Sequence, residues 1–233
     1  MNVIELRSVS AGYDGVEAVA DLDLDVRAGE VVALLGANGA GKTTTIAAVC
    51  GLANVHRGSV LLVGHDVTDS SPRARARLGL ATVADDRGVF TQLTVAENLR
   101  VGSVRRQPSL PLDSWFPALV PLLGRRAGLL SGGEQTMLVL ARAVVSRPRA
   151  LVVDELTTGL APGSAAAALA VLRRTAHEWG TGVLLAEQSA GLALEAADRA
   201  CVFRRGQIAL AGAPSEIAGQ PGLLEATYLG EMD

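Results

Sequence analysis

Hydrophobic and polar residues alternate near the start of the chain, over residues 3–9 and again over residues 17–27. In the second segment Asp21, Asp23 and Asp25 occupy every other position, with apolar residues between them. A period of two is typical of antiparallel strands that have one face in the core and one in water. The sequence therefore predicts two paired strands joined by a turn at residues 12–15.

Further along the chain, short apolar runs alternate with segments of helical periodicity. An apolar run of four to eight residues is typical of a buried strand. Strands are predicted at residues 31–35, 59–64, 79–83, 149–155 and 181–186, with a hairpin at 200–204 and 207–210. Helices are predicted at residues 43–50, 72–78, 94–101, 136–146, 162–179 and 190–197. This order predicts a single α/β domain.

The middle of the chain departs from this alternation. Four prolines fall between Gln107 and Pro121, which predicts a linker or a set of short turns between two helical pieces. We therefore expect a core formed by residues 1–84 and 146–233, with a small, mostly helical subdomain inserted at residues 85–145.

Composition and charge narrow the classes of function. The formal net charge is −3 and the isoelectric point is near 5.7, which argues against a nucleic-acid partner. The basic clusters are short and scattered, so we interpret them as solvated helix faces: Arg73/Arg75/Arg77, Arg105/Arg106 and Arg125/Arg126. Cys50 and Cys201 are far apart in apolar surroundings, which favours buried free thiols in a reducing compartment. No apolar run approaches the ~18 residues of a membrane-spanning helix, and the start lacks a secretory pattern, so we expect a cytosolic protein.

One segment carries a specific chemical signal. Gly36-Ala37-Asn38-Gly39-Ala40-Gly41-Lys42-Thr43 matches G-x-x-x-x-G-K-[ST] and lies between a predicted strand and a predicted helix. Glycine backbones can wrap around an oligophosphate, and the helix start adds partial positive charge. Lys42 brings a cation to the outer phosphates, and the Thr43 hydroxyl can ligate Mg²⁺. Lys42 is the single lysine of the chain, so a compact ammonium stands where a planar guanidinium would fit poorly.

Two carboxylates end a later apolar run. Asp154 and Glu155 follow Ala150-Leu151-Val152-Val153, and adjacent residues on a strand point to opposite faces. The two acids therefore need different roles. We assign Asp154 to Mg²⁺ and Glu155 to the water that attacks the γ-phosphate.

A second anion-binding site is predicted at the start of a helix. Ser131, Gly132 and Gly133 precede an apolar-periodic helix, and a serine with two glycines at a helix start suits an anion. Because one phosphate group is not held twice within one such domain, this site suggests a second chain. An ordinary glycine-rich helix cap would give the same pattern.

Taken in order, these pieces resemble the ATP-binding subunit of ABC transporters over nearly the whole chain. The specific combination is the phosphate loop, then Leu130-Ser131-Gly132-Gly133-Glu134-Gln135, then Ala150 to Glu155. The spelling of Gly159-Leu160-Ala161-Pro162 and Leu184-Leu185-Ala186-Glu187-Gln188 resembles the ATPases of branched-chain (hydrophobic) amino-acid uptake systems. The resemblance implies a P-loop NTPase core of the ABC type, with an N-terminal antiparallel β-subdomain and an inserted α-helical subdomain.

The resemblance also implies roles for the matching residues. Residues Gly36 to Thr44 would bind the phosphates of ATP, and Ser131 to Gly133 would grip the γ-phosphate of ATP held by a second ATPase subunit. Tyr13 would stack on the adenine. The residue pattern alone fits equally well a turn tyrosine that covers the sheet edge and binds no ligand. Residues 157–160 would cross the dimer interface. The two subunits, identical or different, would drive a membrane permease from its inner face, served indirectly by a substrate-binding protein.

Three positions depart from the usual family pattern. Asp85, which we assign to Mg²⁺, stands where most members have glutamine, and Gln188 stands where most have a histidine that senses the γ-phosphate. Both match the branched-chain relatives, and we assign Gln188 to catalysis. Glutamine can hydrogen-bond the phosphate or the water but cannot carry a proton. Leu156 replaces the proline that usually follows the catalytic glutamate, which leaves the pose of Glu155 open.

Several functions remain compatible with these motifs. An importer of branched-chain amino acids is the reading we prefer, and the same machine could serve another small polar cargo such as urea or short amides. A soluble ABC ATPase acting on nucleic acid or ribosomes would need tandem copies or an added basic segment. A catalytically silent partner in a heterodimer is disfavoured by the intact Glu155 and Ser131 to Gly133.

Overall fold

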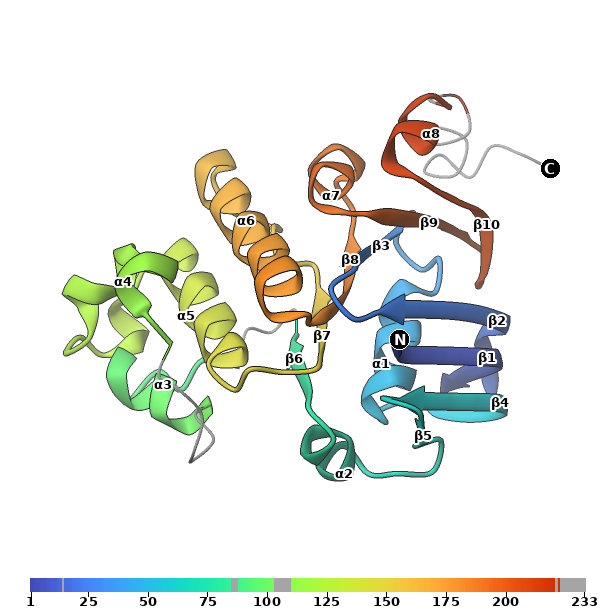
Figure 1. Ribbon diagram of the computed structural model, residues 1–233, viewed down its shortest axis with the longest axis horizontal. Helices are drawn as coiled ribbons and strands as arrows, with labels where there is room; N and C mark the ends of the chain where they lie inside the picture. The colour runs from blue at the N-terminus through green and yellow to red at the C-terminus, as the bar shows by residue number, and fades with distance from the viewer. Residues whose placement is uncertain (14, 85–87, 103–109, 221, 223–233) are drawn as a thin grey trace.

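The computed structural model describes residues 1–13, 15–84, 88–102, 110–220 and 222. Within them the chain forms two sheets with helices around them (Figure 1). The smaller sheet is antiparallel, with strand order β2-β1-β4-β5. Its strands are β1 (Asn2–Tyr13), β2 (Val16–Arg27), β4 (Asn54–Leu62) and β5 (His65–Asp66). The predicted N-terminal antiparallel pair is confirmed.

The larger sheet has strand order β10-β9-β3-β8-β7-β6. Its strands are β3 (Val31–Leu35), β6 (Leu80–Val83), β7 (Ala150–Asp154), β8 (Gly182–Glu187), β9 (Arg199–Arg204) and β10 (Gln207–Gly212). All pairs are parallel except the hairpin of β9 and β10. Every residue of β3, β7 and β8 is buried, which explains why their sequences are continuous apolar runs.

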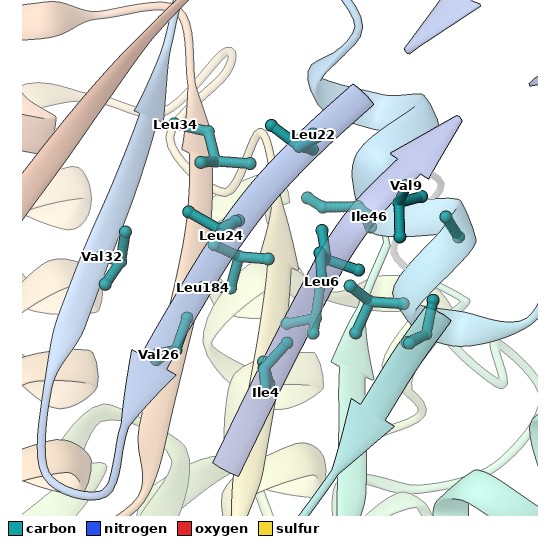
Figure 2. Close-up of a cluster of buried hydrophobic side chains, with 14 of the residues drawn as sticks. Ile4, Leu6, Val9, Leu22, Leu24, Val26, Val32, Leu34, Ile46 and Leu184 are labelled. Carbon is teal, nitrogen blue, oxygen red and sulfur yellow. The ribbon is translucent and has the colours of Figure 1, made fainter. Parts of the chain in front are cut away.

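The helices are α1 (Lys42–Cys50), α2 (Pro72–Arg77), α3 (Val95–Gly102), α4 (Leu112–Trp115), α5 (Gly132–Val144), α6 (Pro162–Trp179), α7 (Ala190–Ala196) and α8 (Pro214–Ala218), with 3₁₀ turns η1 (Pro117–Leu122) and η2 (Ala127–Leu129). Helix α1 packs between the two sheets. Figure 2 shows side chains of β1, β2, β3 and β8 meeting Ile46 of α1 in one apolar cluster. The alternating residues of β1 and β2 thus form one wall of the core that supports α1.

The helical part of the molecule has its own core. Helices α3, α4 and α5 gather at one end (Figure 1), and Trp115, Phe116 and Leu119 are buried there with the apolar face of α5. The described part of the proline-rich segment is therefore not a linker: it forms α4 and η1, which bury aromatic side chains. A capping box at Thr94, whose Oγ1 and backbone N both bond with Glu97, starts α3 as predicted.

The interpretation of Arg75 as a solvated residue is wrong. Its side chain is 1% exposed, and its guanidinium donates to the carbonyl oxygens of Ala48, Val49, Thr68 and Ser70. Two of these carbonyls belong to the last turn of α1, where helix carbonyls lack partners within the helix. Arg75 is thus a structural cap for the helix that begins at the phosphate loop. Arg73, Arg77, Arg125 and Arg126 are exposed, as predicted, and Arg105 and Arg106 lie outside the described residues.

Candidate functional site: the loop between β3 and α1

The loop that joins β3 to α1 is shaped by three glycines. Gly36, Gly39 and Gly41 have φ values of 148°, 77° and 111°, which L-amino acids with a side chain rarely adopt. At Gly36 a Cβ atom would lie 2.6 Å from the carbonyl oxygen of Phe203. The glycines of the motif are therefore required by the backbone path, and the loop opens directly onto the first turn of α1.

Lys42 lies inside this loop. Its side chain is 4% exposed, and Nζ donates to the carbonyl oxygens of Gly36 at 2.6 Å and Ala37 at 3.0 Å. Burial lowers the pKa of Lys42, and the negative charges of Glu155, Asp154 and Glu187 oppose that shift. The ammonium group is thus positioned by the backbone it sits in, with carboxylates facing it from the ends of β7 and β8.

A cavity of about 190 Å³ opens beside the loop. It is lined by Ala18, Asn38, Gly39, Gly41, Lys42, Thr43, Thr44 and Glu155. The β1–β2 hairpin closes one side, because the position of a Cβ on Gly41 would lie 3.0 Å from the carbonyl oxygen of Ala18. The structure therefore brings six of the predicted phosphate-binding residues and Glu155 to one cavity, whereas Gly36, Ala37 and Ala40 do not line it.

Glu155 reaches the cavity through a backbone turn. β7 ends at Asp154, and Glu155 has a left-handed φ of 48°. The prediction that both acids belong to one strand is therefore wrong, because Glu155 lies just beyond the end of β7. Asp154 is 6% exposed at the strand end. Leu156, the unexplained departure from the family pattern, is buried with the core of the helical part.

Gln188 and Thr158 hold the carboxylate of Glu155. Gln188 Nε2 donates to Glu155 Oε1 at 2.5 Å, and Thr158 Oγ1 donates to Oε2 at 3.4 Å. The structure thus places the two residues assigned to catalysis in direct contact. An amide that donates to one oxygen fixes the carboxylate orientation and leaves the second oxygen for a weaker donor.

Glu187 is a site residue that the motif analysis did not assign. Its side chain is 1% exposed, and its two oxygens accept from the backbone N and from Oγ1 of Thr157, both at 2.9 Å. Burial raises the pKa of the Glu187 carboxyl, against the two hydrogen bonds from Thr157. The sequence held one signal for it: an ionisable residue continues the apolar run of β8 just before Gln188.

Ser131, Gly132 and Gly133 are not among the residues that line the loop cavity. Ser131 is the N-cap of α5, where its Oγ accepts from the backbone N of Glu134 at 3.3 Å and its own N donates to Glu134 Oε2 at 2.7 Å. Ser131 and Gly132 are exposed. Within one chain the second predicted anion site is an exposed helix cap, separate from the first.

The remaining predicted residues divide into two groups. Tyr13 ends β1, pairs with Val16 and is 46% exposed, so its ring is open to a ligand at the hairpin tip. Asp85 lies outside the described residues. In the described part of the chain Cys50 and Cys201 are buried free thiols, as predicted. Among the same residues no helix is long and apolar enough to cross a membrane.

The donor set near the loop fits a magnesium ion. Thr43 offers a hydroxyl in the cavity wall, and Asp154 ends β7, which is separated from β3 by β8 alone. The carboxylate of Glu155 lies in the wall of the same cavity. Hydroxyl and carboxylate oxygens are the hard donors that suit a small divalent cation.

Comparison with known proteins gives one consistent result. The family model described as ABC transporter matches residues 19–158. The branched-chain amino-acid transport ATP-binding protein BraG of Pseudomonas aeruginosa is 35% identical over 98% of this chain and 100% of its own length. The probable branched-chain amino-acid transport protein LivF of Archaeoglobus fulgidus is 35% identical over 91% of this chain and 93% of its own. The lipopolysaccharide export protein LptB of Acidithiobacillus ferridurans is 32% identical over 99% of this chain and 98% of its own.

Solved structures agree with the sequence relatives. The ATP-binding subunit of an ABC transporter superposes with a TM-score of 0.81 at 28% identity, covering 97% of this chain and 95% of that chain. An ATP-binding cassette of an ABC transporter in its ADP conformation gives a TM-score of 0.83 at 25% identity, over 99% and 100% of the two chains.

Proposed function

Because this chain belongs to the ABC transporter family, we propose that it is the ATP-hydrolysing subunit of an importer of branched-chain amino acids. Membership of the family makes the chain an ATP-binding transporter subunit with ATPase activity and confirms the predicted ABC-type α/β fold. The cargo, the direction of transport and the role of each site residue belong to the proposal.

Two observations support the cargo. BraG and LivF, each 35% identical, are both described as branched-chain amino-acid transport proteins. The spelling of residues 159–162 and 184–188 points to the same group. LptB, an export protein, is nearly as similar at 32% identity, so the overall identity supports the cargo less strongly than the motif spelling does.

The position of Glu155 in the wall of the loop cavity carries the catalytic part of the proposal. We assign ATP phosphates to the backbone N–H groups of residues 36–44, to which the start of α1 adds partial positive charge. Lys42 exchanges its bonds to the Gly36 and Ala37 carbonyls for phosphate oxygens. Glu155 accepts a proton from the attacking water, and Gln188 keeps its carboxylate oriented.

Magnesium completes the assignment. Thr43 and Asp154 are the described ligands, and Asp85 is assigned to the same ion from outside the described residues. Bound Mg²⁺ neutralises the charge that develops on the phosphates. Tyr13, exposed at the hairpin tip, stacks on the adenine.

The exposed Ser131 to Gly133 segment supports a composite site. We assign it to the γ-phosphate of ATP held by a second ATPase subunit, identical or different, because it is not part of this chain's own loop cavity. The pair of subunits acts from the cytoplasmic face on membrane permeases. A substrate-binding protein delivers the cargo to these permeases. The surface from Asp85 to Thr94 is our candidate for permease contact; its described part includes Phe90, which is 47% exposed.

Replacement of Glu155 by Gln tests the catalytic assignment. The amide cannot accept the proton, so hydrolysis should stop while ATP binding stays intact, and an ATP-bound dimer should accumulate. Size-exclusion chromatography with ATP, together with phosphate release, measures both effects. Hydrolysis at the parent rate would refute the role of Glu155.

Co-purification from native membranes tests the cargo. The chain should bring down permease subunits, and the purified complex in proteoliposomes should hydrolyse ATP faster with leucine, isoleucine or valine and the matching binding protein. Stimulation by urea or short amides instead would select the alternative cargo. Recovery with nucleic acid or ribosomes and no permease would contradict transport.

A further inference from the structure

Two pairs of hydrogen-bonded side chains connect the segment that follows β7 with the last residue of β8 and the residue after it. Gln188 donates to Glu155, and Glu187 accepts from Thr157. The register of the sheet places the ends of β7 and β8 side by side, since Asp154 pairs with Ala186 and the backbone N of Glu155 donates to the Ala186 oxygen at 2.9 Å. We propose that Glu187 is a positioning residue for ATP hydrolysis, acting through its clamp on Thr157 to hold Glu155 in the cavity.

Both oxygens of Glu187 accept hydrogen bonds from Thr157. Oε1 accepts from the Thr157 backbone N and Oε2 from the Thr157 hydroxyl, each at 2.9 Å, and Thr157 is 8% exposed. A buried carboxylate with two short hydrogen bonds is costly to move, because breaking either bond leaves an unpartnered charge away from water. The clamp therefore fixes the position of Thr157 relative to the end of β8.

The clamp acts on a segment that does not hold its shape by itself. Glu155 has a φ of 48°, a left-handed conformation that costs free energy for a residue with a side chain and persists where surrounding contacts enforce it. The contacts that follow are Leu156 in the core, Thr157 on Glu187 and Thr158 on the Glu155 carboxylate. Glu187 supplies two of the hydrogen bonds in this set, both to Thr157.

The clamp also links three parts of the proposed site: the phosphate loop, the segment 157–160 and Glu155. β8 pairs with β3 on its other side, where Glu187 is in register with Leu35, the residue before the phosphate loop. Thr157 begins the segment 157–160 assigned to the interface between subunits. Glu187 thus connects the segment 157–160 to the edge of the sheet from which the phosphate loop starts. A displacement of the segment 157–160 would therefore also displace Glu155.

This inference rests on the proposed role of Glu155, and its test keeps the two separate. Thr157→Val removes the hydroxyl and keeps the backbone bond, while Thr157→Ser keeps both bonds. Glu187→Gln keeps the side-chain shape but replaces one of the two acceptor oxygens with an N–H donor and removes the negative charge. ATP binding to the full chain, followed with a fluorescent ATP analogue, should change less than about twofold in all three, because the phosphate loop is untouched.

Turnover should separate the variants. At saturating ATP, kcat should fall about tenfold to a hundredfold in Glu187→Gln and clearly in Thr157→Val, since displacement of a catalytic group by an ångström has effects of that size. Thr157→Ser should retain the parent kcat. The double variant Glu187→Gln/Thr157→Val should be no slower than Glu187→Gln, because both changes remove one interaction.

Each outcome decides the matter. Parent kcat in Thr157→Val and Glu187→Gln, with Glu155→Gln inactive, overturns the positioning role and leaves the proposed function standing. Hydrolysis by Glu155→Gln at the parent rate overturns the proposed function itself. If Glu187→Gln does not fold, judged by circular dichroism, the pair Thr157→Val and Thr157→Ser decides: equal kcat in these two refutes the clamp, and a loss confined to valine supports it.

Discussion

The phosphate loop and the start of α5 are both predicted anion sites, and they are built in opposite ways. Around the loop, Lys42 is 4% exposed and already bonded to two carbonyls, and glycines fix the backbone path. At α5, Ser131 is exposed and its hydroxyl caps its own helix. The first site is preorganised within one chain, whereas the Ser131 hydroxyl would have to give up its bond to Glu134 in order to bind an anion. This difference is what a site shared between two subunits requires.

The largest expected effect concerns the preorganised side. Lys42→Ala should reduce ATP affinity by about thirtyfold or more, because loss of a buried, hydrogen-bonded charge contact costs about 2–5 kcal/mol. Isothermal titration calorimetry with ATP measures it. The exposed Arg126→Ala on the helical part is the matched control and should bind normally. Normal affinity in Lys42→Ala would remove the loop from the site.

Mixing two inactive variants tests whether the exposed side serves another chain. Lys42→Ala and Ser131→Arg should each be inactive, since each damages both sites of a head-to-tail homodimer. In a mixed dimer one site carries both lesions and the other carries none, so about a quarter of the parent ATPase activity should return if the two sites act independently. Activity that never recovers on mixing, with both variants folded and able to dimerise, would contradict a site shared between copies of this chain.

A smaller effect, the pH dependence of stability, distinguishes the buried Glu187 from the partly exposed Glu134. Burial raises the pKa of Glu187 above its ordinary value of 4.5, whereas hydrogen bonds from Ser131 lower the pKa of Glu134 below 4.5. The stabilisation from Glu187 is therefore complete below pH 4.5 and is lost as the pH rises through its folded pKa. The stabilisation from Glu134 is present above pH 4.5 and is lost as the pH falls through its folded pKa.

Urea unfolding from acid to neutral pH measures these slopes. As pH rises above 4.5, the free energy of unfolding of the parent should fall relative to Glu187→Gln. Below pH 4.5 the free energy of unfolding of the parent should approach the value of Glu134→Gln as the pH decreases. If the difference in unfolding free energy between parent and variant changed with pH in the same direction for Glu187 and Glu134, the opposite pKa shifts of the two residues would be contradicted.

The sequence predicts best where local pattern and tertiary role agree. Helix α6 spans Pro162–Trp179 as predicted, because Pro162 can start a helix and Gly180 can end it in a left-handed conformation. The phosphate loop is equally predictable, since its glycines meet a local backbone demand. Strand β4 begins at Asn54, well before the expected residue 59, because pairing with β1 extends it through polar residues.

Contacts between distant residues explain what the sequence did not reveal. Arg75 belongs to a polar-looking helix, and only the carbonyls at the end of α1 make it a buried residue. The Glu187–Thr157 clamp joins residues thirty positions apart, and no local pattern in either segment shows that the two side chains meet. Aromatic packing of Trp115 against Trp179 likewise turns a proline-rich segment into part of a core. In each case the deciding partner lies on another element.

The guanidinium of Arg75 has one further consequence for α1. Its positive charge sits on the carbonyl end of the helix, where the backbone dipoles present their negative pole, while the opposite end opens onto the phosphate loop. The positive charge of Arg75 offsets the negative end of the helix dipole, so the electrostatic potential at the start of α1 favours an anion even without bound nucleotide. A lysine ammonium has three N–H donors on one nitrogen, fewer than the four carbonyls that Arg75 contacts, so lysine could not replace this arginine at the end of α1.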